Sequence, residues 1–431
     1  MRVVVIGAYG LIGSYVVARL LAEGHDLVGV GRDIAMARRR FPRVSWALAD
    51  LAATSVADWA ALLRAADAVV NCAGALQDSG RDDLQAVHVT GVERLLQSCA
   101  ADGVRRFIQI SAAGVGAGRT TEFNRTKLAA ETMLAATDLD WVILRPGLVL
   151  APAAYGGTAL LRGLAAFPWI VPVACPDSIV QVVSALDVAA AVAKLLSTPE
   201  IRRVSIDLVH ADAWRFDALV LELRRWLGLP PARAVRVPAA LLRSATYAAD
   251  ALAAFGWRSP MRRAAFEQLR QGVRGDGAAA ERVLGLRLQS LPEMLEAWPS
   301  GVQERWFARC YFLKPALLTT LGAFWFLSGL IGLVFRFPEA VQVLTSAGIL
   351  PLPAEAAVAA GGLADMAAAG AIVFRRSAGP ALRAMLLLSL AYLVGGTLLR
   401  PDLWLDPLGS FLKTIPAGLL AVAALAILDE R

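Results

Sequence analysis

Short runs of aliphatic residues alternate with amphipathic stretches over the first part of the chain. The first run, Val3–Ile6, is too short for the apolar core of a signal peptide and predicts a buried parallel strand. A helix from Leu11 to Glu23 and a strand over Leu27–Gly31 follow, and the alternation continues to a strand over Trp141–Leu144. This pattern predicts a doubly wound α/β fold with a parallel sheet, whose ligands lie at the carboxyl ends of the strands.

The last part of the chain has a different pattern, with four apolar runs separated by short loops. A spanning helix needs about 20 mostly apolar residues, and the third run reaches that length if it starts near Ala381. Helices of a soluble bundle would carry polar faces, and these runs barely do. We therefore expect an all-α four-helix transmembrane bundle with spans at Ala316–Phe335, Ala356–Phe374, Met385–Leu399 and Leu408–Leu428.

These patterns divide the chain into three expected parts. Residues 1–150 form the doubly wound, Rossmann-type domain, residues 151–300 a small lobe that completes the N-terminal unit, and residues 301–431 the transmembrane domain. The composition agrees, because the chain is 57% hydrophobic and only 18% charged, whereas soluble proteins average about 25% charged.

The distribution of arginines, cysteines and histidines argues against nucleic acid and metal ions as partners. The net charge of +7 comes mostly from scattered arginine pairs that are not interleaved with aromatic residues, so it favours anionic lipid over nucleic acid. The four cysteines form no CxxC pair and the three histidines have no ligand spacing, which indicates reduced thiols and no metal site.

Basic residues predict the orientation in the membrane. Arg305, Arg309 and Lys314 precede the first span, and residues 375–383 carry three arginines between the second and third spans. Positive residues remain on the cytoplasmic side. We therefore expect a multi-pass protein of the cytoplasmic membrane, with the Rossmann domain and both termini in the cytoplasm.

The turn after the first strand carries a glycine motif that binds phosphate. Gly7 permits the tight turn, Gly10 lets the backbone approach a pyrophosphate, and Gly13 lets the helix pack on the sheet. The helix N-terminus then faces the phosphates. After the second strand, Arg32 suits the 2′-phosphate of NADP(H), with NAD(H) as the alternative cofactor, whereas Asp33 is better suited to cap the next helix.

A set of motifs resembles the extended or atypical short-chain dehydrogenase/reductase superfamily. The set comprises GAYGLIG (7–13), ADL (49–51), NCAG (71–74), ISAAG (110–114), RTK (125–127) with Glu131, LRPG (144–147) and SALDVA (184–189). The resemblance implies that Asp50 and Leu51 flank the adenine, that Ala73-Gly74 lies beside the cofactor, and that Lys127 binds the nicotinamide ribose. It also implies that the small lobe over residues 151–300 is a substrate lobe. The expected cofactor-binding residues are Gly7, Tyr9, Gly10, Leu11, Ile12, Gly13, Arg32, Asp50, Leu51, Ala73, Gly74, Lys127 and Pro146.

One departure from the family concerns its catalytic tyrosine, which stands four residues before the lysine. Phe123 occupies that position here, and a phenyl ring has no proton to give to a substrate carbonyl. Ser111 matches the polarising serine of the family, so Ser111 and Lys127 are the expected catalytic residues. Tyr155, in the loop after the last strand, is the nearest tyrosine in sequence that could replace the missing phenol.

The C-terminal part resembles the DoxX-like membrane family in GGLADMAAAG (361–370) and LWLDPLGSFLKTIP (403–416). Asp365 and Lys413 are ionisable residues within spans, and they either serve a function or pair with each other. The sequence predicts a membrane-anchored NAD(P)(H)-binding oxidoreductase-like protein acting on an apolar, lipid-like or quinone-like substrate. The alternative is a catalytically inactive cofactor-binding module that stabilises or senses within a membrane complex.

Overall fold

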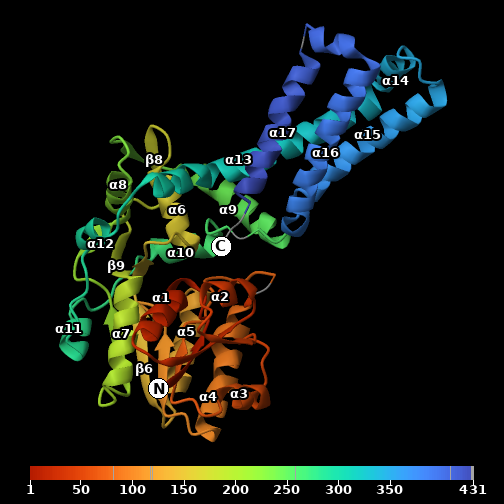
Figure 1. The fold of residues 1–431 in the computed structure, drawn as a ribbon. Helices are drawn as coiled ribbons and strands as arrows, with labels where there is room; N and C mark the ends of the chain where they lie inside the picture. The colour runs from red at the N-terminus through yellow and green to blue at the C-terminus, as the bar shows by residue number, and fades with distance from the viewer. Residues whose placement is uncertain (81, 117, 119, 258, 408, 429–431) are drawn as a thin grey trace. The chain divides into compact units, whose positions relative to one another are not determined.

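The chain folds as two compact units in this computed structural model, which describes residues 1–80, 82–116, 118, 120–257, 259–407 and 409–428. The first unit comprises Met1–Tyr247 and Pro260–Arg305, and the second comprises Ala248–Ser259 and Trp306–Arg431. Each unit is described by itself below, and Figure 1 labels the elements of both.

A seven-stranded sheet, in the order β10-β6-β5-β4-β1-β2-β3, forms the centre of the first unit. All its strand pairs are parallel. Parallel strands covered on both faces are continuous apolar runs, which is why the sequence shows them clearly. The strands are β1 (Arg2–Ile6), β2 (Asp26–Gly31), β3 (Ser45–Leu48), β4 (Ala68–Asn71), β5 (Arg106–Ile110), β6 (Asp140–Pro146) and β10 (Val204–Leu208).

Helices cover both faces of this sheet, as the doubly wound prediction requires. Val3 and Val5 pack in one core with α1 (Leu11–Ala22) and α7 (Ala185–Ser197). Val4 and Ile6 point to the opposite core, which holds residues of α3 (Val56–Leu63), α4 (Gly91–Ala101) and α5 (Glu122–Ala135). The predicted parallel Rossmann-like sheet is confirmed. Its strand β10 comes from outside residues 1–150, so the expected range of the Rossmann domain omits one strand of the sheet.

The first unit also contains two smaller sheets and further helices. A three-stranded sheet joins β7 (Leu148–Leu150), β9 (Ile179–Ser184) and β11 (Ala213–Arg215), and a two-stranded one joins β8 (Ile170–Val173) and β12 (Arg233–Arg236). The helices are α2 (Ala35–Arg40), the π-helical η1 (Ala86–Thr90), α6 (Gly156–Ala165), α8 (Phe216–Trp226), α9 (Ala239–Ala254), which runs into the second unit, α10 (Arg263–Arg270), α11 (Ala279–Leu284) and α12 (Leu291–Ala297).

Local capping differs from expectation at one acid near the cofactor-choice position. Asp33 was expected to cap the helix after β2, but the N-cap residue of α2 is Ile34, without a side-chain bond. The Asp33 backbone N–H instead donates to the Tyr9 hydroxyl at 3.1 Å. The capping prediction was wrong because α2 begins one residue later than expected, so Asp33 lies before the N-cap residue.

The second unit consists of helices in its described part. Its long helices α13, α15, α16 and α17 contribute residues to one apolar core, which includes Trp325, Ala368, Leu382 and Ala421. The elements are α13 (Val302–Leu330), η2 (Ile331–Phe335), α14 (Phe337–Thr345), α15 (Pro351–Ala371), α16 (Arg375–Leu399), η3 (Pro401–Leu405) and α17 (Ser410–Ala426). The stretch between the first and second expected spans, predicted as a short loop, contains the additional helix α14.

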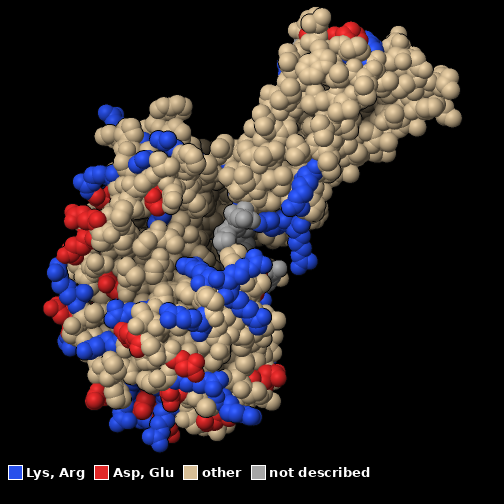
Figure 2. Space-filling view, viewed as in Figure 1, with Lys and Arg blue, Asp and Glu red and all other residues tan. Residues whose placement is uncertain are grey.

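Two helical stretches of the described chain are long and apolar enough to cross a membrane, Val302–Phe335 and Arg375–Leu399, while Ser410–Ala426 is apolar but shorter. Only 22% and 17% of their most apolar windows are buried, unlike the core helix of a soluble protein. The fourth expected span begins at Leu408, which lies outside the described residues. The two units also differ in surface charge. On the face seen in Figure 2, charged side chains cover the first unit, and the helical unit is mostly uncharged.

Candidate dinucleotide site

The expected site residues line up along one edge of the seven-stranded sheet. Because all strands are parallel, their carboxyl ends share that edge. Following the strand order, this edge carries Pro146 on β6, Ser111 after β5, Ala73-Gly74 after β4, the glycine loop after β1, Arg32 after β2 and Asp50 after β3.

The glycine loop is closely packed against its surroundings. Gly7 has φ +71°, and a Cβ there would lie 2.8 Å from the Ala73 backbone nitrogen. A Cβ at Gly13 would lie 2.2 Å from the Gly7 carbonyl oxygen. The N-cap residue of α1 is Gly10, with no side-chain capping bond. The free N–H groups of the helix N-terminus therefore remain available to an anion.

Tyr9 closes the side of the loop that faces β2. Its ring is so close to Gly31 that a Cβ there would lie 2.2 Å from Cε1 of Tyr9. Next to it, Arg32 donates to Asp82 Oδ1 at 2.6 Å, and its guanidinium lies 3.8 Å from Asp50 Oδ2. Asp82 was not predicted to take part in the site. It lies in a loop 50 residues from Arg32, and nothing in its sequence context signals the contact.

Lys127 is the buried cation of the site. It projects from α5 with only 5% exposure, and its Nζ donates to the Ile110 carbonyl at 3.0 Å. A Cβ at Gly74 would lie 3.1 Å from that Nζ, so the glycine keeps space open beside the amine. Burial lowers the pKa of Lys127 to about 8, against the opposing effect of Glu131. An ammonium has three donors, and the described residues accept one of them.

Ser111 presents a second unsatisfied polar group at this edge. The residue is 6% exposed, and its Oγ has no hydrogen-bond partner among the described residues. Buried polar groups are nearly always hydrogen-bonded in folded proteins. The Ser111 hydroxyl and the Lys127 amine therefore fit a ligand with several hydrogen-bonding atoms, such as the ribose and carboxamide of a nicotinamide nucleotide.

His88 is a site residue that the sequence reasoning missed, because its spacing was judged only for metal binding. It lies in η1, and its Nε2 accepts a hydrogen bond from the Ala75 N–H at 3.1 Å. Its Nδ1 lies 2.9 Å from Thr126 Oγ1. Burial, helped by the Lys127 charge, lowers the pKa of His88 to about 2, so the ring is neutral. The sequence offered one signal for His88, because this residue lies in an apolar stretch.

Phe123 occupies the position of the family's tyrosine and contacts His88. The two rings meet edge to face, with centroids 5.8 Å apart. The Phe123 ring therefore packs against the buried His88 ring at the position where the family has a phenol. Tyr155, the tyrosine considered as a replacement, is the residue before α6, and its backbone N–H donates to the Thr158 hydroxyl at 3.1 Å.

Several other predicted residues have mainly structural surroundings. Leu51 is 5% exposed and packs in the core, and Ile12 packs against the opposite core. Glu131 on α5 binds Arg145 through both carboxylate oxygens. The Pro146 carbonyl accepts from the Ala113 N–H at 2.8 Å. These contacts fix β5, β6 and α5 around Ser111 and Lys127. Within the described residues, no group of acids, histidines or cysteines could hold a metal ion.

Comparison with known proteins matches two parts of the chain to protein families. Residues 7–199 match the NAD(P)H-binding family, and residues 322–422 match the DoxX-like family. Uncharacterized proteins of Mycobacterium bovis and Mycobacterium tuberculosis are 30% identical over 191 residues, which is 43% of this chain. The chain spans about a fifth of the length of these relatives, 19% of each.

Solved structures share the fold of the first unit. An NADPH-dependent quinone oxidoreductase from Escherichia coli, complexed with NADPH, matches with a TM-score of 0.54 at 19% identity, over 68% of this chain and 99% of its own. A UDP-glucose 4-epimerase from Stenotrophomonas maltophila with bound NAD matches with a TM-score of 0.53 at 20% identity, over 73% and 99%. These structures support the fold of the first unit, while the family matches assign an NAD(P)H-binding domain to the N-terminal part of the chain and a DoxX-like domain to its C-terminal part.

Proposed function

We propose that the chain is a membrane-anchored NAD(P)H-dependent oxidoreductase of the atypical short-chain dehydrogenase/reductase type, acting on an apolar, lipid-like or quinone-like acceptor. One observation carries the proposal. Within the described residues, the sheet edge buries a serine hydroxyl without a partner and a lysine amine with one accepted donor, next to a glycine loop that leaves a helix N-terminus open. Binding sites for cofactors combine such features.

The residues present fit a nicotinamide dinucleotide along the length of the edge. The glycine loop and the N-terminus of α1 would hold the pyrophosphate, Ala73-Gly74 would border the nicotinamide half, and Lys127 would bind its ribose. Asp50 and Tyr9 stand at the adenosine end, near Arg32. When bound, the cofactor supplies a hydride.

The chemistry of the chain itself rests on Ser111 and Lys127. The Ser111 hydroxyl would donate a hydrogen bond to the acceptor oxygen and hold it in place. Phe123 cannot supply a proton, so we assign proton donation to the Lys127 ammonium, whose pKa of about 8 suits transfer near neutrality. The neutral His88 holds Ala75 and Thr126, and thereby positions the loop beside Lys127.

We further propose that NADP(H) is the preferred cofactor. Arg32 stands where a 2′-phosphate would be bound, and its guanidinium is only partly buried. Asp82 already binds this guanidinium. A 2′-phosphate would therefore compete with Asp82, so the preference should be moderate.

The helical unit is proposed to be a four-span membrane domain with the Rossmann domain and both termini in the cytoplasm. Support comes from the DoxX-like match, the two long apolar helices and their largely exposed apolar side chains. Monomeric soluble proteins rarely expose apolar surface on this scale. Recovery of the full-length protein in the soluble fraction after alkaline carbonate extraction of membranes would contradict the placement.

The competing function is a cofactor-binding module without catalysis, and Phe123 is the observation that favours it. Purification in detergent, followed by a spectrum for bound nicotinamide and an NADPH-oxidation assay with quinones and lipid carbonyls, separates the two. We expect turnover with at least one acceptor, and a 10- to 100-fold increase for carbonyl acceptors in Phe123→Tyr, because a phenol is restored. Tight NADPH binding without turnover in either protein would leave the module, and failure to bind either dinucleotide would exclude both functions.

A further inference from the structure

A single carboxylate joins three helices of the second unit. Asp365 on α15 is 4% exposed. Its Oδ1 accepts a hydrogen bond from the Tyr392 hydroxyl on α16 at 2.7 Å, and its Oδ2 accepts one from the Ser328 hydroxyl on α13 at 3.3 Å. The pairing with Lys413 considered from the sequence does not occur, because Lys413 is exposed on α17 and the bonds of Asp365 go to these two hydroxyls.

No described lysine or arginine forms an ion pair with Asp365. Arg336 and Glu339 form an ion pair with each other at 2.6 Å. Glu355, on the same helix as Asp365, is exposed. A carboxylate has about four acceptor sites, and two neutral donors use two of them. A charge with these surroundings inside an apolar helical unit is costly, and such residues commonly serve a function.

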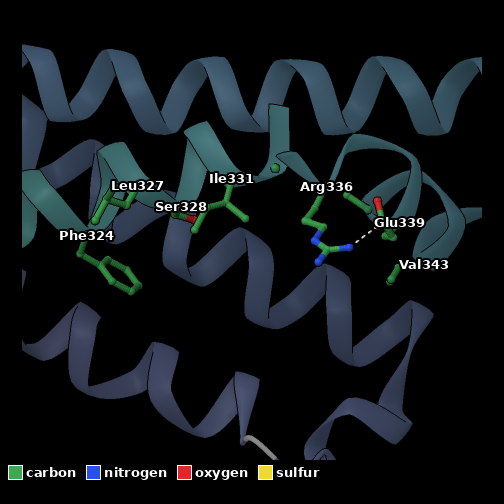
Figure 3. A pocket seen from close by; sticks show the side chains of 9 residues that line it. Phe324, Leu327, Ser328, Ile331, Arg336, Glu339 and Val343 are labelled. Atoms are coloured by element: carbon green, nitrogen blue, oxygen red, sulfur yellow. Dashed lines mark hydrogen bonds and ion pairs between the residues drawn. The ribbon is translucent and has the colours of Figure 1, made fainter. Parts of the chain in front are cut away.

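An open groove of about 600 Å³ reaches this cluster from outside. Its wall includes Phe324, Leu327, Ser328 and Ile331, and the Arg336–Glu339 pair lies toward its other end (Figure 3). Ser328 thus belongs both to the groove and to the carboxylate cluster. Beside it, Trp325 stacks on Tyr392 with ring centroids 6.3 Å apart, and its buried Nε1 has no hydrogen-bond partner among the described residues.

We propose that Asp365 is a proton-exchanging site of the helical domain, reached from the groove through Ser328. The carboxylate takes up one proton to become a carboxylic acid, which neutralises the buried charge, and releases it by the same route. In the protonated state, Oδ2–H donates to Ser328 Oγ, whose own hydrogen turns toward the groove. Tyr392 keeps its bond to Oδ1 in both states. The inference rests on the proposed membrane placement of these helices.

A membrane-permeant carbodiimide tests the proposal, because such reagents modify protonated carboxyl groups in apolar surroundings. The full chain in lipid nanodiscs would be treated with dicyclohexylcarbodiimide between pH 5.5 and 8.5, and adducts located by peptide mass spectrometry. We expect an adduct on Asp365 that falls at least tenfold across this range as the carboxyl loses its proton. Glu355 is the matched control, and a water-soluble carbodiimide with an added amine should modify it instead.

Variants of the three clustered residues separate proton exchange at Asp365 from simple reactivity of its carboxyl group toward the carbodiimide. Tyr392→Phe removes a donor to the charged form, so labelling of Asp365 at pH 7.5 should rise several-fold. Ser328→Leu fills the entrance, so labelling should slow several-fold at every pH. Asp365→Asn should abolish the adduct and keep an acceptor for Tyr392.

The outcomes of this experiment distinguish the site from the membrane proposal. An unlabelled Asp365 at every pH, in a chain that resists carbonate extraction, overturns the site alone. Labelling that does not change with pH also overturns it. A pH-dependent adduct in a chain that carbonate extracts would keep the site and overturn the membrane placement.

Discussion

Each unit buries, at its candidate site, a charge that no ion pair of the described residues neutralises. In the first unit, Lys127 donates to the Ile110 carbonyl, and the nearby acid Glu131 is already bound by Arg145. In the second unit, Asp365 accepts from Tyr392 and Ser328. The Glu131–Arg145 pair shows what a structural buried charge looks like, because both carboxylate oxygens have partners. Unfilled bonding capacity therefore marks Lys127 and Asp365 for a ligand.

The surroundings of these two charges indicate ligands of different size. Lys127 stands at a sheet edge with a glycine loop, open backbone and a serine hydroxyl that no described residue bonds, which suits a large ligand with many acceptors. Asp365 stands among apolar helices with two hydroxyls, which suits a proton. Ligand binding in the first unit should therefore depend on its glycine loop and its buried lysine.

Closing the glycine loop should have the largest effect. In Gly13→Ala, the new Cβ would lie 2.2 Å from the Gly7 carbonyl, a backbone atom, so the loop must move and dinucleotide affinity should fall at least 100-fold. Titration calorimetry of the detergent-purified protein measures this. Gly157→Ala is the control, since no atom lies within 4 Å of its Cβ and affinity should not change. Equal affinity in both variants would remove the loop from the site.

Removing the buried lysine should weaken dinucleotide binding by 10- to 100-fold. A hydrogen bond to a charged group contributes about 1.5–3 kcal/mol, and Lys127→Met deletes this donor. The variant should be at least as stable as the wild type at neutral pH, because the lowered pKa of Lys127 shows that burial disfavours its charge. Lys194→Met, at an exposed lysine of α7, is the control. A destabilised variant with normal affinity would make Lys127 a structural residue.

His88 should make the first unit sensitive to acid. Its pKa is about 2 in the folded state and 6.5 in the unfolded chain, so below pH 6.5 the unfolded chain takes up a proton that the folded protein excludes. Stability therefore decreases as pH falls, by about 1.4 kcal/mol per unit, or about 2 kcal/mol at pH 5. Urea unfolding at pH 6.5 and 5.0 measures the loss, which should be smaller in His88→Asn. An equal loss in both proteins would contradict a neutral His88.

The fold was more predictable than the contacts of the site. The run Val3–Ile6 corresponds to β1, because a strand buried on both faces must be apolar throughout. Parallel strands then place Ser111, Gly74 and Arg32 on one edge without further information. Long-range contacts have no such signal. Asp82 reaches Arg32 from a loop, His88 reaches Ala75 from a π-helical turn, and Ser328 and Tyr392 show no periodicity toward Asp365.

Cofactor choice should show the smallest effect, because Arg32 is shared between Asp82 and the 2′-phosphate. Arg32–Asp82 is a partly exposed pair, and such pairs contribute about 1 kcal/mol or less. Asp82→Ala frees the guanidinium from this competitor, so the ratio of NADH to NADPH dissociation constants should rise by up to about fivefold. Arg32→Asp should move the ratio the other way, since it replaces the cation by an acid that accepts from a ribose hydroxyl. If both variants keep the wild-type ratio, Arg32 does not contact the 2′-phosphate. The dinucleotide would then be held mainly by the glycine loop and Lys127, which bind NAD(H) and NADP(H) equally.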